Sequence, residues 1–285
     1  MSERTFTTLA TGGSFFEGPR WHDGRWWVSD FYRHSVLAIA ADGTTETITT
    51  VEAQPSGLGW LPDDSLLVVS MKDHRVLRVA ADGTTSVHAD LTPYCGGPAN
   101  DIVVAANGRA WVGNFGFDLM AGATPGPAVL VRVDPDGSTG VAAEDLAFPN
   151  GSVITPDGTM LIVGETMGAR YTAFTITADG LLTDRRVWAE VPGVAPDGCT
   201  LDAEGRVWAA DCFGSRVVQV AADRGVVDEI VLPDGLGAYA CMLGGDDGRT
   251  LLVCAAPDFD EARRQADRQA VLLTTTVEVA HAGLP

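Results

Sequence analysis

The chain has 285 residues, 46% of them hydrophobic, and its 19 basic and 38 acidic side chains give a formal net charge of −19. This charge argues against nucleic acid and anionic membrane surfaces as partners, because phosphate binding depends on clustered Lys and Arg. Residues 1–5 carry no apolar signal segment and no run of about eighteen apolar residues follows, so we expect a cytoplasmic protein without a membrane span. Five cysteines without a C-x-x-C pair argue against a disulfide framework or a thiolate zinc site.

A turn followed by an apolar strand recurs six times along the chain. The turns are Asp23-Gly24, Asp63-Asp64, Asn107-Gly108, Asp157-Gly158, Glu204-Gly205 and Asp247-Gly248. Their spacings of 40, 44, 50, 47 and 43 residues are typical of propeller blades. Amphipathic helical periodicity is almost absent. The sequence therefore predicts an all-β fold, a six-bladed β-propeller, as a single domain over residues 1–285.

Elements outside the repeat fit the same architecture. Residues 5–9 precede the first unit, and we expect them to add a strand to the last blade and so remove its open edge. Residues 260–269, rich in Glu, Ala, Arg and Gln, predict a short helix inserted in the last blade. The tryptophans of the first strands are interpreted as packing between blades: Trp26, Trp27, Trp111 and Trp208.

One phase of the repeat carries polar residues. Counting back from the turns gives Glu17, Ser56, Asn100, Asn150, Asp197 and Ala240. Equivalent positions of a closed ring face one another, so the carboxylates and amides should converge. They would form an all-oxygen site suited to a hard divalent cation. The alternative is that Asn150-Gly151 and Asp197-Gly198 are ordinary turn dipeptides.

Four segments of the chain carry a family resemblance. Residues 16–21 (FEGPRW), 99–101 (AND), 148–151 (FPNG) and 195–199 (APDGC) resemble the signature segments of the senescence marker protein/gluconolactonase/luciferin-regenerating enzyme family. The resemblance implies a propeller with one divalent metal in its central tunnel, held by Glu17, Asn150 and Asp197. It also implies that Asn100 and Asp118 face the substrate and that Asp197 is the catalytic acid/base residue.

One position departs from that pattern. Members that act on sugar lactones typically have an arginine two residues before the asparagine of the Asn-Asp pair, and here Pro98 stands there. Proline has no side-chain donor for substrate hydroxyls, so glucono-lactone should be a poor substrate unless Arg20 or Arg170 replaces the donor. Phe115, Phe117 and Met120 are candidates for a less polar lip.

The predicted function is a metal-dependent lactonase, gluconolactonase-like, that opens a small-molecule lactone with metal-activated water and Asp197 as general acid/base. Two alternatives stay open: a phosphotriesterase-like hydrolase that uses the same site, and a non-enzymatic propeller that binds metal or protein. The oxygen donors favour Ca²⁺, with Mg²⁺, Mn²⁺ and Zn²⁺ as alternatives. The oligomeric state, and any role for Cys199 two residues beyond Asp197, stay undecided.

Overall fold

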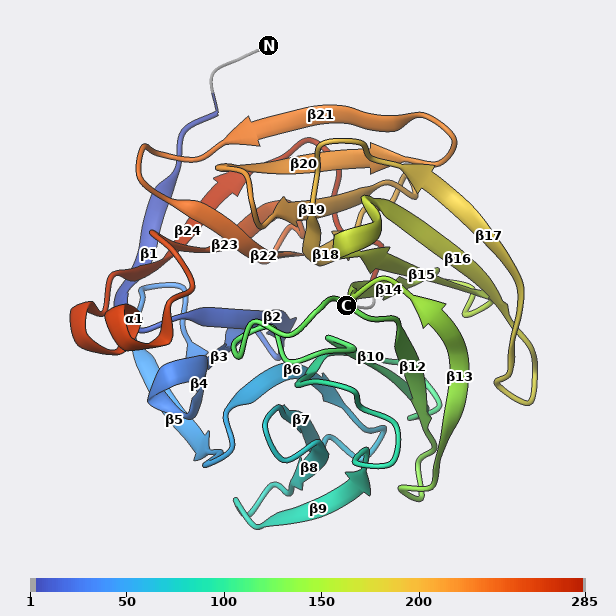
Figure 1. Ribbon diagram of the computed structural model, residues 1–285. Helices are drawn as coiled ribbons and strands as arrows, with labels where there is room; N and C mark the ends of the chain where they lie inside the picture. The colour runs from blue at the N-terminus through green and yellow to red at the C-terminus, as the bar shows by residue number, and fades with distance from the viewer. Residues whose placement is uncertain (1–3, 284–285) are drawn as a thin grey trace.

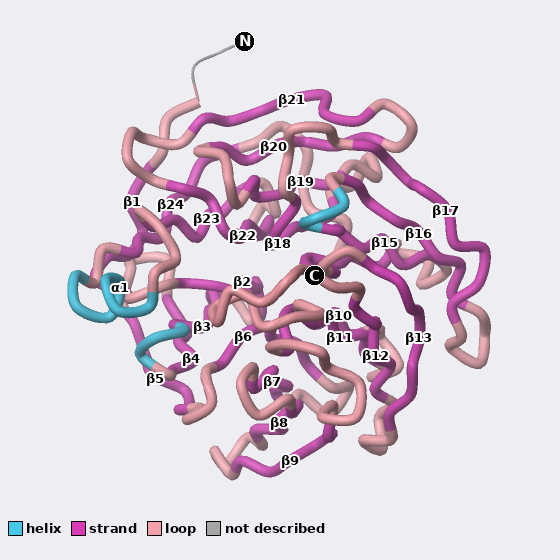
Figure 2. Tube along the Cα trace, viewed as in Figure 1, coloured by secondary structure: helices cyan, strands magenta, loops and turns pink. Residues whose placement is uncertain are grey.

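The computed structural model describes residues 4–283 and arranges them as six four-stranded antiparallel sheets around one axis (Figure 1). The all-β, six-bladed propeller predicted from the repeat is confirmed. Residues 1–3 and 284–285 lie outside the described part. The expectation about a signal segment in residues 1–5, and the two ends of the predicted domain 1–285, therefore fall partly outside it. Figure 2 shows how far strands predominate over helical segments.

Each blade runs from an inner strand beside the axis to an outer strand at the perimeter. Blades 1 to 3 are β2 Phe16–His22, β3 Arg25–Asp30, β4 Ser35–Ile39 and β5 Thr45–Thr50; β6 Pro55–Trp60, β7 Leu66–Ser70, β8 Arg75–Val79 and β9 Thr85–Asp90; and β10 Ala99–Val104, β11 Ala110–Asn114, β12 Ala128–Val133 and β13 Thr139–Leu146. Blades 4 to 6 are β14 Pro149–Ile154, β15 Met160–Glu165, β16 Arg170–Ile176 and β17 Leu182–Glu190; β18 Pro196–Leu201, β19 Val207–Asp211, β20 Arg216–Ala221 and β21 Gly225–Val231; and β22 Gly237–Gly244, β23 Thr250–Ala256, β24 Ala270–Thr276 and β1 Thr7–Gly13.

The predicted turns join the first and second strands of the blades. At Asp23 and Gly24 both central residues have positive φ, 49° and 70°, which is the backbone of a type I′ hairpin turn. That turn matches the right-handed twist of the strands that it connects. The Asp-Gly turn therefore sets the pairing register of β2 and β3, and the register decides which residues of β2 face the axis.

The ring is closed by strands from opposite ends of the chain. β1 pairs antiparallel with β24, with Thr7 opposite Thr274 and Gly13 opposite Ala270. This confirms the expectation that the N-terminal residues complete the last blade, with the strand beginning at Thr7. The last blade thus gains its outer strand and keeps no unpaired edge at β24.

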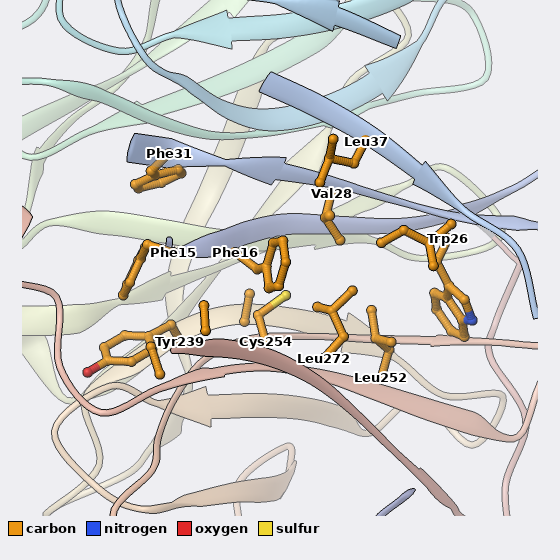
Figure 3. Packing of buried hydrophobic residues seen from close by; sticks show 14 of the residues in the cluster. Phe15, Phe16, Trp26, Val28, Phe31, Leu37, Tyr239, Leu252, Cys254 and Leu272 are labelled. Carbon is orange, nitrogen blue, oxygen red and sulfur yellow. The ribbon is translucent and has the colours of Figure 1, made fainter. Parts of the chain in front are cut away.

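Six hydrophobic clusters hold the blades together, one at each contact between neighbours. The closing contact packs Phe16, Trp26 and Val28 of blade 1 against Leu252 and Leu272 of blade 6 (Figure 3). Trp27, Trp111 and Trp208 lie in three of the other clusters, so the interpretation of the four tryptophans as packing between blades is confirmed. Each large apolar side chain buried this way contributes about 1.5–3 kcal/mol.

The helical segments are short and lie in connections. The 3₁₀ turns η1 Phe31–Arg33 and η2 Thr166–Gly168 follow β3 and β15, and α1 Glu261–Asp267 lies between β23 and β24. The predicted helix in the last blade is confirmed. Its first turn is capped by Asp260, whose carboxylate accepts the Arg263 N–H at 2.8 Å. Across residues 4–283, no helix has the length and apolar character needed to cross a bilayer.

Candidate active site on the propeller axis

The predicted ring positions share one place in the fold: each lies at the start of an inner strand. Glu17 is on β2, Asn100 on β10, Asn150 on β14 and Asp197 on β18. The alternative interpretation of Asn150-Gly151 and Asp197-Gly198 as turns is wrong, because both dipeptides lie within strands. All four polar residues line a single cavity on the axis, and Asn100, Asn150 and Asp197 are buried.

The glycine after a ring residue has a steric role. A Cβ on Gly151 would lie 2.3 Å from the Asp197 carbonyl oxygen, and a Cβ on Gly198 would lie 2.7 Å from the Ala240 Cα. Neighbouring inner strands therefore approach too closely for any side chain at these positions. Each inner strand also shows a register shift at this level, and such bulges re-aim side chains.

The electrostatics of the ring are those of two carboxylates without a counter-charge. Burial, and next to it the neighbouring Asp197, raises the pKa of Glu17 well above its usual range. Burial, followed by the charge of Asp101, raises the pKa of Asp197 to about 8. Arg20 does not neutralise the pair, because its guanidinium is engaged by Asp101 at 2.8 Å and by the Ile102 carbonyl at 2.6 Å.

The donor set fits a hard divalent cation. The Asn150 amide nitrogen donates to Thr166 Oγ1 at 3.2 Å, which leaves the carbonyl oxygen of Asn150 as the atom free for a ligand. Together with Glu17 and Asp197 it forms a set of oxygens with two negative charges. A cation would stabilise the ionised form of both carboxyls, which burial, and after it the neighbouring acidic groups, disfavour. In the described part of the chain no group of three His, Cys, Asp or Glu side chains has metal-binding geometry, so a site here includes the amide.

The cavity walls repeat from blade to blade above the ring. The residue two before a ring position accepts a backbone hydrogen bond from the residue that follows the second strand, and both positions face the axis in most blades. The pairs are Phe31 N to Phe15 O at 2.9 Å, Met71 to Gln54 at 2.9 Å, Phe115 to Pro98 at 3.0 Å, Thr166 to Phe148 at 3.0 Å and Cys212 to Ala195 at 3.1 Å. All of these except Ala195 line the cavity.

The predicted substrate-facing residues divide into two groups. Asn100 and Pro98 line the cavity, and the Asn100 amide nitrogen is buried without a hydrogen-bond partner in the described structure. Asp118 is exposed and is not part of the cavity lining; its carboxylate accepts the Ala121 N–H at 3.0 Å within its own loop. The lip residues divide likewise: Phe115 and Met120 line the cavity, whereas Phe117 is buried beside Phe148 at a centroid distance of 6.0 Å.

Neither of the arginines considered as a substitute donor reaches the cavity. Arg20 is buried in the pair with Asp101, and Arg170 binds Glu165, Nε to Oε1, at 2.9 Å. Neither arginine therefore replaces the side-chain donor that is missing at Pro98.

Several lining residues were not predicted. Cys212 lies beside Asp197, where burial, followed by the charges of Asp197 and Asp211, raises the pKa of its thiol. Cys199, on the inner strand β18, is buried in the cluster between blades 4 and 5 and does not line the cavity. Gln54 lines the wall with its side-chain oxygen unpartnered in the described structure. Both residues could have been found from the repeat. Cys212 stands directly after the second strand of its blade, and Gln54 stands two residues before the ring position Ser56.

Three buried carboxylates hold the segments that lead into three inner strands. By strand register each lies opposite the residue just before Glu17, Asn150 or Asp197. The contacts are Asp30 with the N–H groups of Ser14 at 3.1 Å and Phe15 at 3.2 Å, Glu165 with the Ala147 N–H at 2.7 Å, and Asp211 with the Ala195 N–H at 3.0 Å. The corresponding residues of blades 2 and 3 are Ser70 and Asn114. The clamped blades are those that supply the candidate metal ligands.

A six-bladed propeller with carboxylates and amides converging on its axis defines the class of the protein. Residues 15–257 match the profile described as the SMP-30/Gluconolactonase/LRE-like region. The chain belongs to this family.

Individual relatives agree with this assignment. A 6-deoxy-6-sulfogluconolactonase from Pseudomonas putida is 30% identical over 171 residues, which cover 59% of this chain and 57% of the relative; the chain thus spans little more than half of that protein's length. A solved Xanthomonas campestris structure described as a gluconolactonase is 25% identical, with a TM-score of 0.78 over 97% of this chain and 91% of its own. A calcium-binding regucalcin from Agrobacterium tumefaciens is 22% identical, with a TM-score of 0.81 over 100% of this chain and 96% of its own, and shows the likeness of fold.

Proposed function

We propose that this protein is a divalent-metal-dependent lactonase that hydrolyses a small-molecule cyclic ester in the axial cavity. The observation that carries the proposal is the convergence of Glu17, Asn150 and Asp197 at the base of one cavity, in a chain of the gluconolactonase family. Relatives named as lactonases support the reaction class.

Glu17, Asn150 and Asp197 would hold the metal through oxygen atoms, and Ca²⁺ is the proposed ion because all the donors are hard oxygens. Bound there, a divalent cation would polarise the lactone carbonyl and lower the pKa of a nearby water. Mg²⁺, Mn²⁺ and Zn²⁺ are tested as alternatives.

The side chains divide the remaining work. One oxygen of Asp197 would hold the metal, and the other would accept a proton from the attacking water. As the new carbon–oxygen bond forms and the ring carbon–oxygen bond breaks, the same carboxyl returns the proton to the leaving alkoxide, which gives a hydroxy acid. Asn100 has an unpartnered amide nitrogen, whose N–H donates a hydrogen bond to the substrate. The apolar upper wall keeps bulk water away from the reacting bond.

A phosphotriesterase is the second candidate, because the same oxygen ligands would hold a cation against a phosphoryl oxygen. A non-enzymatic binding module is the third. Both lack the support that family relatives give to lactone hydrolysis. Some hydrolases use a histidine as the general base; none of the residues that line this cavity is a histidine.

The test is a panel of lactones and phosphotriesters assayed with protein treated with EDTA and then supplied with one divalent ion at a time. We expect lactone hydrolysis that EDTA abolishes and a metal ion restores. Hydrolysis of phosphotriesters alone would establish the second candidate. No turnover with any of the four ions would contradict the enzymatic proposal and leave the binding module.

A further inference from the structure

We infer that the substrate is a hydroxyl-poor lactone that carries an apolar alkyl or aryl substituent, and that this substituent lies against the aromatic upper wall of the cavity. The inference rests on the proposed function and names the substrate class of the same site. It comes from the residues that line the cavity above the ring.

Every blade supplies a large, mainly apolar side chain to the lining of the cavity. In each case the side chain lies in the connection between the second and third strands. The contributing residues, in blade order, are Tyr32, Met71, Met120, Met167, Phe213 and Phe259. These connections differ in length and sequence, so the shared apolar character is a property of the cavity and not of a copied repeat.

Four of these side chains are exposed although they are large and apolar: Met120, Met167, Phe213 and Phe259. Phe213 has 65% of its surface exposed. Single exposed apolar residues are ordinary, but several around one concave site mark a surface that binds apolar groups. The clustering at this mouth indicates that an apolar part of the ligand covers them.

The polar groups of the cavity are too few for a polyhydroxylated ring. None of the lining residues is an arginine, and Lys72 is paired with Glu261 at 3.2 Å. The Tyr32 hydroxyl donates to the Phe259 carbonyl at 2.7 Å, and the Thr166 hydroxyl donates to the Pro196 carbonyl at 2.7 Å. Away from the unpartnered Gln54 oxygen and Asn100 amide nitrogen, a sugar hydroxyl placed against this wall would lose its hydrogen bonds to water without replacement.

Phe148 occupies the wall directly above Asn150 under backbone strain. Its φ is +63°, a region that is an outlier for a bulky residue. Its ring stacks on Phe115 at a centroid distance of 4.3 Å and an interplanar angle of 24°. The stacked pair forms a flat apolar surface just above the reacting centre, which suits the substituent next to a lactone ring.

A homologous series tests the substrate class. With Ca²⁺ in excess, kcat/KM is measured for δ-valerolactone, for δ-lactones with progressively longer alkyl chains, and for glucono-δ-lactone. We expect kcat/KM to rise about three- to fourfold with each methylene that fits the wall, and glucono-δ-lactone to lie below the series. A flat or falling series, or a preference for glucono-δ-lactone, overturns the inference.

A matched pair of variants locates the effect. Phe213→Ser removes an exposed rim side chain, and Val231→Ser removes a 64% exposed side chain on the outer strand β21. Phe213→Ser should lower kcat/KM for the longest lactone at least fivefold, mainly through KM, and lower it less for δ-valerolactone. Val231→Ser should change neither. Equal behaviour of the two variants on the longest lactone contradicts the assignment of the rim.

Binding of the hydroxy-acid products separates this inference from the proposed function. Calorimetry should give a heat-capacity change that becomes more negative with chain length. If the wild type hydrolyses short lactones without any gain from the alkyl chain, the lactonase proposal stands and the substrate class is wrong. If products bind more tightly with chain length but no lactone is hydrolysed, the wall is supported and the lactonase proposal fails.

Discussion

Asp197 has two carboxylate oxygens, and the proposed function gives each a separate task. Asp197→Asn keeps one carbonyl oxygen for coordination but cannot accept a proton. General-base loss typically costs about 10²–10⁴-fold in rate, so kcat of the metal-saturated variant should fall by that order while metal affinity changes less. kcat measured against pH and metal concentration decides this. Full recovery of the rate at saturating metal and high pH would show that Asp197 is only a ligand.

The raised pKa of Asp197 also predicts how the metal-free protein responds to pH. The folded state keeps a proton on this carboxyl up to about pH 8, whereas the unfolded chain releases it near pH 4. The folded state therefore binds more protons between these values, and stability contributed by this group falls as pH rises through the window.

Melting temperatures of chelator-treated wild type and Asp197→Asn, measured from pH 5 to pH 8, test this expectation. The wild type should lose more stability over the range than the variant, which has no titrating carboxyl at this position. Excess divalent metal should reduce the difference, because it favours the ionised form. Parallel curves for the two metal-free proteins would contradict the raised pKa.

At the scale of the strands, the clamps Asp30, Glu165 and Asp211 connect the second strand of a blade to the segment before its ring residue. Glu165→Gln should leave the Ala147 N–H and Arg170 poorly satisfied, and the loss of such buried partners costs about 1–3 kcal/mol. The substitution should also weaken metal binding, because the segment before β14 would no longer hold Asn150 in place. Denaturant unfolding and metal titration of the same variant measure the two effects.

A control for the clamp comes from a blade without a candidate metal ligand. Ser70→Ala changes the corresponding position of β7 and should leave metal affinity as in the wild type. Equal metal affinities for Glu165→Gln and the wild type would mean that the clamp supports the fold without positioning the ring.

The sequence predicts this fold well because its repeat is marked by turn chemistry. Asp-Gly turns fix register, and register fixes which residue faces the axis, so Glu17, Asn100, Asn150 and Asp197 could be found by counting. The upper wall could not be found that way. Connections after the second strands differ in length, the wall uses residue types that also build cores, and Phe148 points into the cavity through a φ that no local propensity favours. Asp118, taken from family resemblance alone, lies on an exposed loop outside the cavity lining.

At the scale of the whole molecule, the candidate ligands come from blades 1, 4 and 5. Blades 4 and 5 are neighbours that share a hydrophobic cluster, whereas blade 1 shares a cluster with neither of them. A metal held by all three would link blades that otherwise touch mainly their neighbours. Binding should therefore raise the melting temperature, by an amount that grows with the logarithm of the metal concentration divided by Kd. The fold itself depends on the six clusters between blades and not on the ring.

The central claim is that one axial ring binds the metal on which hydrolysis depends. Calorimetric titration of chelator-treated protein with Ca²⁺, on wild type, Glu17→Gln and the exposed control Glu52→Gln, tests it most directly. We expect one site per chain in the wild type and the control, and affinity at least 100-fold weaker in Glu17→Gln, about 3 kcal/mol in binding free energy, with an unchanged far-ultraviolet spectrum. Equal affinity in all three proteins would contradict the account.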